Sequence, residues 1–253
     1  MAGQNIDINC DIGESSSEHM AGREGDLMPW VSSCNISCGF HAGDPWVIER
    51  ALDMAIRRGI RIGAHPSYMD RAGFGRQEMD MDPDQLRSVI KYQVAMMKAL
   101  TESKGGKLTY VKPHGALYNQ ASRDEEISEA IVASLIEIDS SLALMGMAGS
   151  VTEHVAKEFG VPFIKEAFID RTYEADGYLT PRGKDNALIE DPEVALSQLR
   201  SMVDKGVVPV NGGGELTIQA ESFCVHGDNE AAPKILRYIH EQMSGLGYEI
   251  KPV

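Results

Sequence analysis

Short apolar runs that end near a histidine recur along the chain. Each run has the length and the flanking turn residues of a buried strand, and each histidine lies beside Gly, Pro or Ala. One such histidine is usually structural. Four at equivalent places predict a shared function, because each buried polar ring must be compensated by hydrogen bonds. The runs and their histidines are 33–37 before His41, 60–64 before His65, 108–113 before His114, and 222–225 before His226.

Amphipathic helices are predicted between these strands. Asp44 supplies a side-chain oxygen for free helical N–H groups, and Pro45 suits the first helical position. Apolar residues then recur on one face until Gly59, a typical helix end. The same Asp-Pro start occurs at Asp82 and Asp191. Further helices are predicted over 82–104, 191–205 and 229–244.

Seven units of strand followed by helix predict a parallel sheet, because parallel strands need crossover connections. Further strands are predicted over 6–14, 142–147 and 162–168. Polar residues follow six of the seven strands. Closure into a seven-stranded parallel β/α barrel would bring these ends to one mouth, whereas an open doubly wound sheet, the alternative, would scatter them.

The first strand carries Asp7, Asn9 and Asp11 on one side. A solvent-facing side is the simpler interpretation. A barrel strand has no such side, however, so these groups are expected to point inward and to need a partner such as substrate, a cation or a histidine.

Several connections lack helical or strand periodicity. Residues 14–26 are expected to form a mobile loop with an exposed His19, and 170–190 is long enough to suggest a lid. The glycine-rich stretch 67–76, which ends at Arg76, is as consistent with a plain loop as with an anion site. Residues 207–218 predict a hairpin. His154 and His240 are expected on helix surfaces.

Composition narrows the function classes. The 253 residues are 43% hydrophobic, enough for one domain over 1–253. A formal charge of −14 argues against nucleic acid or an anionic membrane as partner. No apolar run approaches the ~18 residues of a membrane span. Without Cys-x-x-Cys pairs, the cysteines are expected to be buried thiols in a reducing, cytoplasmic setting. They are Cys10, Cys34, Cys38 and Cys224.

The motifs together resemble the LamB/YcsF family over almost the whole chain. They are Asp7-x-Asn9-x-Asp11-x-Gly13-Glu14, Cys38-Gly39-Phe40-His41-Ala42-Gly43-Asp44, Gly63-Ala64-His65-Pro66, Lys112-Pro113-His114-Gly115-Ala116-Leu117-Tyr118, Glu166-Ala167-Phe168-x-Asp170-Arg171 and Cys224-Val225-His226-Gly227-Asp228. The resemblance implies a barrel similar to the glycoside hydrolase/deacetylase superfamily. It also implies a cytoplasmic complex with subunits B and C that opens 5-oxo-L-proline to L-glutamate while splitting ATP. The stretch Ser15–His19 departs from the family pattern and is shorter than expected.

Lactam opening needs an activated carbonyl, an attacking water and a proton for the ring nitrogen. Carboxylates and histidines serve the proton steps, and cations suit a carboxylate or phosphoryl group. The candidate catalytic residues are Asp11, His41, Asp44, His65, His114, Glu166, His226 and Asp228. The candidate substrate-binding residues are Asn9, Lys112, Tyr118, Asp170 and Arg171. No P-loop sequence is present to hold the ATP.

Two alternatives of other classes remain. A metal-dependent deacetylase or amidohydrolase would use Asp11, His41 and His65 as ligands of a divalent metal ion, as the superfamily resemblance allows. A non-catalytic binding subunit would act only through its partners. For Asp44, the choice is between a catalytic and a structural role. We favour a carboxylate that acts on a partner such as His41, with a plain helix cap as the alternative.

Overall fold

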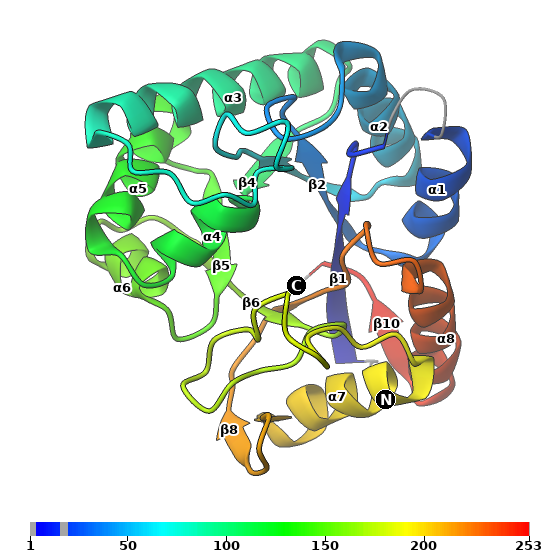
Figure 1. The fold of residues 1–253 in the computed structure, drawn as a ribbon. Helices are drawn as coiled ribbons and strands as arrows, with labels where there is room; N and C mark the ends of the chain where they lie inside the picture. Colours follow the sequence, from blue (N-terminus) through cyan, green and yellow to red (C-terminus); the bar gives the residue numbers. More distant parts are fainter. Residues whose placement is uncertain (1–3, 16–19, 253) are drawn as a thin grey trace.

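Seven parallel strands form a closed barrel in the computed structural model, which describes residues 4–15 and 20–252. Each strand pairs with the next along the chain, and the last pairs with the first, which confirms the predicted closure. Helices ring the strands on the outside (Figure 1). The barrel strands are β1 (Gln4–Ile12), β2 (Ser33–Ser37), β3 (Arg61–His65), β4 (Leu108–Val111), β5 (Ala143–Met147), β6 (Phe163–Phe168) and β9 (Ser222–Cys224).

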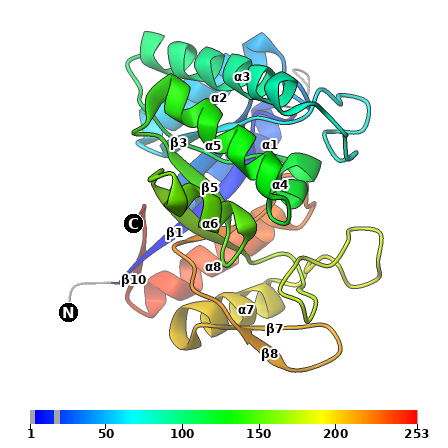
Figure 2. The same cartoon turned by 90° about the vertical axis from the view of Figure 1, so that its left-hand side faces the viewer.

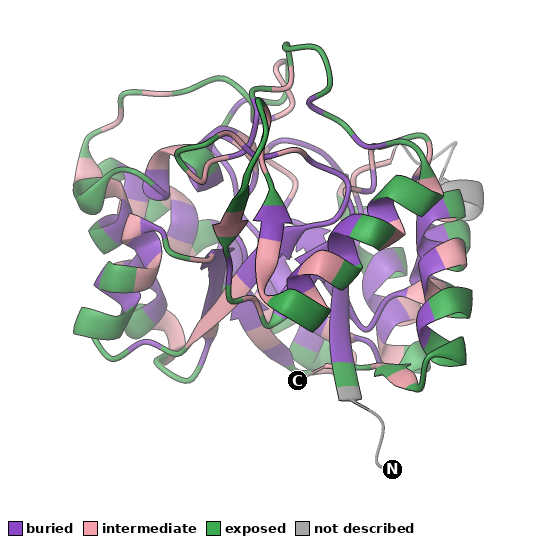
Figure 3. Cartoon of the chain, turned by 90° about the horizontal axis from the view of Figure 1, so that it is seen from below, coloured by how far each residue is buried: buried purple, intermediate pink, exposed green. Residues whose placement is uncertain are grey.

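The helices bury one face against the barrel and leave the other in solvent (Figure 3). In α2, for example, the residues from Val47 to Ala55 that face the barrel are buried, and Gly59 ends the helix in the left-handed conformation. All three Asp-Pro starts are confirmed, since each aspartate accepts backbone N–H groups of the first turn. The helices are α1 (Met20–Leu27), η1 (Met28–Trp30), α2 (Pro45–Arg58), α3 (Pro83–Ser103), α4 (Gly115–Ala121), α5 (Glu125–Asp139), α6 (Val151–Glu158), α7 (Pro192–Lys205) and α8 (Ala232–Gly245).

Three small elements lie outside the ring. The predicted hairpin is present as antiparallel β7 (Val207–Pro209) and β8 (Glu215–Thr217), close to α7 (Figure 2). The sequence did not indicate β10 (Tyr248–Ile250), a short strand that pairs with the amino end of β1. Among the described residues, no helix is both long and apolar enough to cross a membrane.

Two local predictions were wrong. The segment 14–26, expected to be a loop, contains α1, whose two glycines and lack of an apolar period hid it from sequence patterns. His19 lies outside the described residues. His240 is half-buried rather than exposed, because its ring packs edge-on against Trp30 at 5.4 Å between centroids. His154 is exposed, as predicted, and all four cysteines are free and buried.

The polar side of β1 points into the barrel, as expected. At the amino end, buried Asp7 accepts from Ser32 and Ser33 and pairs with Arg61 at 2.5 Å. One layer higher, Asn35 of β2 donates to both Asn9 and Asp11 at 2.8 Å. Hydrogen bonds between side chains therefore compensate these polar groups for their burial.

Tyr110 of β4 fills the lumen beside this network. Its hydroxyl donates to Asn35 Oδ1 at 2.6 Å, and its ring lies over Gly63 of β3. A Cβ atom on Gly63 would lie 2.2 Å from the Tyr110 ring. The position of the Tyr110 ring therefore requires glycine at position 63.

We predict that Gly63→Ala lowers the free energy of unfolding by about 1–3 kcal/mol, because the barrel must shift to admit the methyl group. Gly183→Ala is the matched control, since Gly183 lies outside the barrel and no atom lies within 4 Å of the added Cβ. Urea unfolding followed by circular dichroism measures both. Equal stability of the two variants would contradict this account of the lumen.

Candidate functional site

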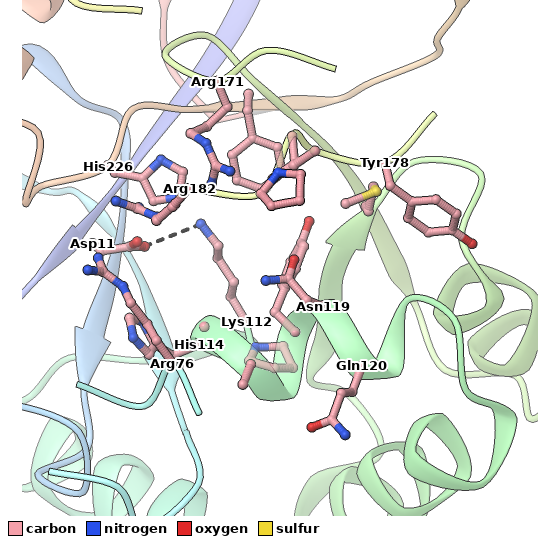
Figure 4. Close-up of a pocket in the computed structure, with 18 of the residues that line it drawn as sticks. Asp11, Arg76, Lys112, His114, Asn119, Gln120, Arg171, Tyr178, Arg182 and His226 are labelled. Carbon is pink, nitrogen blue, oxygen red and sulfur yellow. Dashed lines mark hydrogen bonds and ion pairs between the residues drawn. The ribbon is translucent and has the colours of Figure 1, made fainter. Parts of the chain in front are cut away.

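A cavity of about 490 Å³ opens at the carboxyl ends of the barrel strands. We call it the mouth cavity (Figure 4). Its walls combine groups from widely separated segments, among them Asp11, Lys112, His226 and Asp228. The segment 170–190, predicted as a lid, supplies part of the wall through residues 178–182. The barrel therefore gathers at one place the strand ends that the sequence marked as polar.

Lys112 is the charge at the floor of this cavity. Its side chain is 3% exposed, and Nζ lies 3.2 Å from Asp11 Oδ1 and 2.7 Å from Glu166 Oε1. Nζ also donates to Asn9 Oδ1 at 3.3 Å. Burial alone would lower the pKa of Lys112, but Asp11 and other neighbours raise it well above the usual value. Lys112 is therefore a permanent cation held by carboxylates from two other strands.

Beside Lys112 lies a group that we call the histidine cluster: Glu14, His41, His65 and His114. Glu14 Oε1 lies 2.9 Å from His41 Nε2, 3.4 Å from His114 Nδ1 and 3.8 Å from His65 Nε2. The rings of His41 and His114 stack in parallel with centroids 3.7 Å apart. Three of the four predicted histidines thus meet around a single carboxylate.

Burial and mutual repulsion set the charges in this cluster. Burial lowers the pKa of both His41 and His114, and neighbouring histidines lower it further. Burial also disfavours a charge on His65, but Asp11 raises the pKa of that ring above its usual value. Asp11 itself has a lowered pKa, because Lys112 and His65 outweigh its burial. These shifts favour a cluster in which the three histidine rings are not all protonated at once.

The fourth histidine, His226, belongs to a separate pair. His226 Nδ1 lies 2.9 Å from Asp170 Oδ1, and the backbone N–H of His226 donates to Asp170 Oδ2 at 3.0 Å. Burial would raise the pKa of Asp170, but His226 and Asn229 lower it below its usual value. The ionised carboxylate therefore fixes Nδ1 as the nitrogen that carries the hydrogen and leaves Nε2 as an acceptor in the neutral ring.

Arginines form one wall of the mouth cavity, although the chain is acidic overall. Arg76 and Arg182 both pair with Asp228, the latter at 3.1 Å. Burial would raise the pKa of Asp228, but these guanidinium groups bring it to about 2. Arg123 lies over the Tyr178 ring at 4.0 Å. We call Arg76, Arg123 and Arg182 the arginine wall, and its chemistry suits a carboxylate or phosphoryl group.

Apart from Asp44, the predicted site residues fall into three sets. Asp11, His65, Lys112, His114, Tyr118, Arg171, His226 and Asp228 line the mouth cavity. His41 lies behind it in the histidine cluster. Asn9, Glu166 and Asp170 are buried and hold other site residues: Asn9 and Glu166 contact Lys112, and Asp170 fixes His226. Direct substrate binding by Asn9 and Asp170 stays a prediction, and the contacts that the structure gives them are with Lys112 and His226.

Arg171 and Asp44 make contacts that the sequence did not indicate. Arg171 lines the cavity, but its guanidinium donates to the carbonyl groups of Thr180 and Ala187, and burial lowers its pKa to about 10. It therefore braces the 170–190 segment. Asp44 is not among the residues that line the cavity, and its carboxylate accepts the Val47 N–H at 2.9 Å. The plain helix cap accounts for its position.

Sequence patterns did not single out the arginine wall or the role of Glu14. Glu14 follows β1 and was assigned to a loop, because only the three-dimensional meeting of β1, β2, β3 and β4 shows its contacts with three histidines. Arg76 ends the glycine-rich stretch that carried a weak anion signal, and Arg182 lies in the 170–190 segment. Arg123 follows α4 and carried no signal at all.

Comparison with known proteins places the chain in a family. A family model described as the LamB/YcsF family matches residues 6–253. The chain belongs to the LamB/YcsF family. Members similar to it include the A subunit of the 5-oxoprolinase of Geobacillus thermodenitrificans, 42% identical over 97% of this chain and 96% of that protein, and the protein of the same name in Heliobacterium modesticaldum, 41% identical over 97% of both.

Solved structures agree with this membership. A crystal structure of a "Lactam Utilization Protein" from Thermus thermophilus is 36% identical, has a TM-score of 0.92 and matches 99% of this chain and 100% of that one. The catalytic domain of a peptidoglycan N-acetylglucosamine deacetylase from Eubacterium rectale is 9% identical, with a TM-score of 0.52, over 99% of this chain and 89% of that one. At that identity it shows a shared fold only. The barrel of this LamB/YcsF member is thus also found in a deacetylase.

The capping position of Asp44 leads to a prediction with two variants. Asp44→Asn keeps a cap acceptor, so the free energy of unfolding should change by no more than about 0.5 kcal/mol, whereas Asp44→Ala should cost about 1 kcal/mol. Turnover should stay near normal in Asp44→Asn. Urea unfolding and an assay of the variant together with its partner subunits measure both quantities. A fall in turnover of ~10²-fold in a stably folded Asp44→Asn would restore the catalytic interpretation.

Proposed function

We propose that this chain is the A subunit of an ATP-dependent 5-oxoprolinase, which opens the lactam of 5-oxo-L-proline to give L-glutamate. Similarity of about 40% over nearly the full length to proteins of that name supports the assignment. The observation that carries it in the structure is the meeting of a His226–Asp170 pair with the arginine wall in one cavity. A proton-transfer group and an anion site are two of the requirements of this reaction.

The substrate is a small carboxylic acid with an unreactive amide. ATP can activate the amide by phosphorylating its carbonyl oxygen. Water then adds to the carbonyl carbon, the C–N bond breaks, and the ring nitrogen takes a proton. A second water releases phosphate from the resulting acyl phosphate. Substrate and activated intermediate are both anionic, so the arginine wall suits the carboxylate, the phosphoryl group or both.

His226 is the residue that we assign to proton transfer. Asp170 holds Nδ1 in its protonated form, so Nε2 can accept a proton from the attacking water and return it to the ring nitrogen. The ring is also fixed by stacking on Phe168, with centroids 5.3 Å apart. Lys112, at the cavity floor, offers a buried positive charge to oxygen atoms that become negative during the reaction.

We propose that the chain acts in a complex with subunits B and C. The sequence has no P-loop, so we assign ATP binding to the assembled complex, in the cytoplasm, rather than to a site on this chain alone. The segment 170–190 carries Arg182 and Tyr178 into the cavity wall, and its closure over bound substrate is part of the proposal.

The other function classes make different predictions. A metal-dependent deacetylase or amidohydrolase would hydrolyse an acetylated substrate without ATP, and the histidine cluster is the observation in its favour. A non-catalytic binding subunit would tolerate loss of His226 without loss of turnover. The first alternative is tested by deacetylation without ATP, and the second by glutamate release from the assembled complex.

We predict that the purified chain alone releases no glutamate from 5-oxo-L-proline and ATP, whereas the chain with subunits B and C does. In the complex, His226→Gln should lower kcat by on the order of 10²-fold or more, because water activation loses its base. His154→Gln, an exposed histidine on α6, is the matched control and should leave turnover unchanged. Glutamate release and ADP formation are measured together.

Robust glutamate formation by the single chain would contradict the assignment of ATP chemistry to a complex. Normal turnover in a folded His226→Gln complex would remove the catalytic role of the mouth cavity and favour the binding-subunit alternative. Deacetylation of an acetylated sugar by the single chain, without ATP, would favour the hydrolase alternative.

A further inference from the structure

The imidazole rings of His65 and His114 face each other through two nitrogens that would both be acceptors in the neutral rings. His65 Nδ1 lies 2.7 Å from the carbonyl oxygen of Lys112, and His114 Nε2 lies 2.9 Å from that of Phe74. A carbonyl oxygen only accepts, so both ring nitrogens must donate. His65 Nε2 and His114 Nδ1 therefore carry lone pairs in the neutral rings, yet they lie 2.9 Å apart. A positive charge between them must offset this repulsion.

The protein fixes this arrangement with a strained backbone. Phe74 adopts a left-handed conformation with φ 56°, and Gly75 follows with φ 66°. The pair directs the Phe74 carbonyl towards His114 and brings Gly75 so close that a Cβ there would lie 2.8 Å from His114 and 2.9 Å from His41. Strain of this kind in a non-glycine residue is typical of functional sites. Backbone carbonyls that orient histidines are in turn typical of metal centres.

Two further lone-pair atoms converge on the same point. Glu14 Oε1 and His41 Nε2 lie 2.9 Å apart, and all four residues of the cluster offer ligand atoms that lie within 4.8 Å of one another. His114 Nδ1 lies 2.9 Å from His65 Nε2. Glu14 Oε1 lies 3.4 Å from His114 Nδ1 and 3.8 Å from His65 Nε2. A tetrahedral ion with bonds of ~2.0–2.1 Å would hold its ligand atoms roughly 3.3 Å apart. A single proton would serve only two of the four atoms.

We propose that Glu14, His41, His65 and His114 bind one divalent transition-metal ion, with Zn²⁺ the best match to three imidazoles and a carboxylate. This set differs from the one expected from sequence, because Glu14 and His114 take the place of Asp11. Asp11 Oδ1 already accepts from Asn35 and pairs with the ammonium group of Lys112. Because this ammonium group already places a positive charge beside Asp11, a metal ion bound there would be repelled. The ammonium group also contacts Cys224 Sγ at 3.2 Å.

The proposed centre adjoins the mouth cavity, because His65 and His114 line both. A bound ion there would supply a Lewis acid at the cavity wall. The proposal does not rest on the 5-oxoprolinase assignment, since it concerns ion binding by the isolated chain. Its test is therefore read from binding and spectra, not from turnover.

The test uses the full-length chain after removal of metal with a chelator. Zn²⁺ binding is followed by isothermal titration calorimetry, and Co²⁺ binding by the visible absorption of a four-coordinate cobalt site. The variants are His114→Gln and Glu14→Gln, with His154→Gln as the control that also removes one histidine. Circular dichroism checks that each variant folds, and Glu14→Gln serves alone if His114→Gln does not.

We expect one Zn²⁺ per chain in the parent protein and in His154→Gln, with a melting temperature that rises on binding. Affinity should fall by on the order of 10²-fold in His114→Gln and Glu14→Gln, and the cobalt absorption should weaken in both. No saturable binding to the parent chain would overturn the proposal and leave a shared proton between the two rings. Unchanged affinity in the folded variants would overturn it as well.

Discussion

The ammonium group of Lys112, buried between Asp11 and Glu166, is the interaction on which the rest of the site depends. Burying any one of these charges alone costs several kcal/mol, and only their mutual pairing makes the polar lumen stable. The pairs cross the barrel, since Lys112 follows β4, Asp11 belongs to β1 and Glu166 to β6. Asn35 and Tyr110 extend the network to β2 and β4. Ion pairs and side-chain hydrogen bonds thus occupy this part of the barrel lumen.

The same residue connects the lumen to the histidine cluster. The Lys112 side chain holds Asp11, and the Lys112 carbonyl accepts from His65 Nδ1 and so sets the tautomer of that ring. His65 in turn faces His114, whose other nitrogen is fixed by the strained Phe74 carbonyl. His226 lies near Asp11 on the other side of the site, with Asp170 as its own support. The histidine cluster and the His226–Asp170 pair therefore both lie beside the buried ammonium group of Lys112.

Much of the fold could be predicted from the sequence, because its signals are local. The Asp-Pro starts at Asp44, Asp82 and Asp191 and the turn at Gly59 depend only on neighbouring residues. The histidines that follow the strands were found for the same reason. Helix α1 was missed, because its sequence has two glycines and no apolar period, and its contacts are with η1 and α8, which lie elsewhere in the sequence.

The sequence predicted which residues belong to the site, but not which of them contact one another. The strand pattern predicts that Asp11 points inward and the motifs single out Glu166, yet only the closed barrel shows that both meet Lys112. The contacts of Glu14 and Arg123 carry no sequence signal, since their partners lie on other segments. Asp44 shows the limit of spacing alone: a recurring His-then-Asp spacing suggested catalysis, whereas the contact present in the structure is a local hydrogen bond from the Val47 N–H.

A double-mutant cycle on the free energy of unfolding tests the role of the buried cation most directly. Lys112→Met, Glu166→Gln and the double variant are compared with the parent chain by urea unfolding. Lys112→Met should cost ~3–5 kcal/mol, because it leaves buried carboxylates unpaired. The double variant should cost less than the sum of the single variants, with a coupling of about 1–3 kcal/mol. Costs that add to within about 0.5 kcal/mol would show that the two charges do not depend on each other, and would contradict the account.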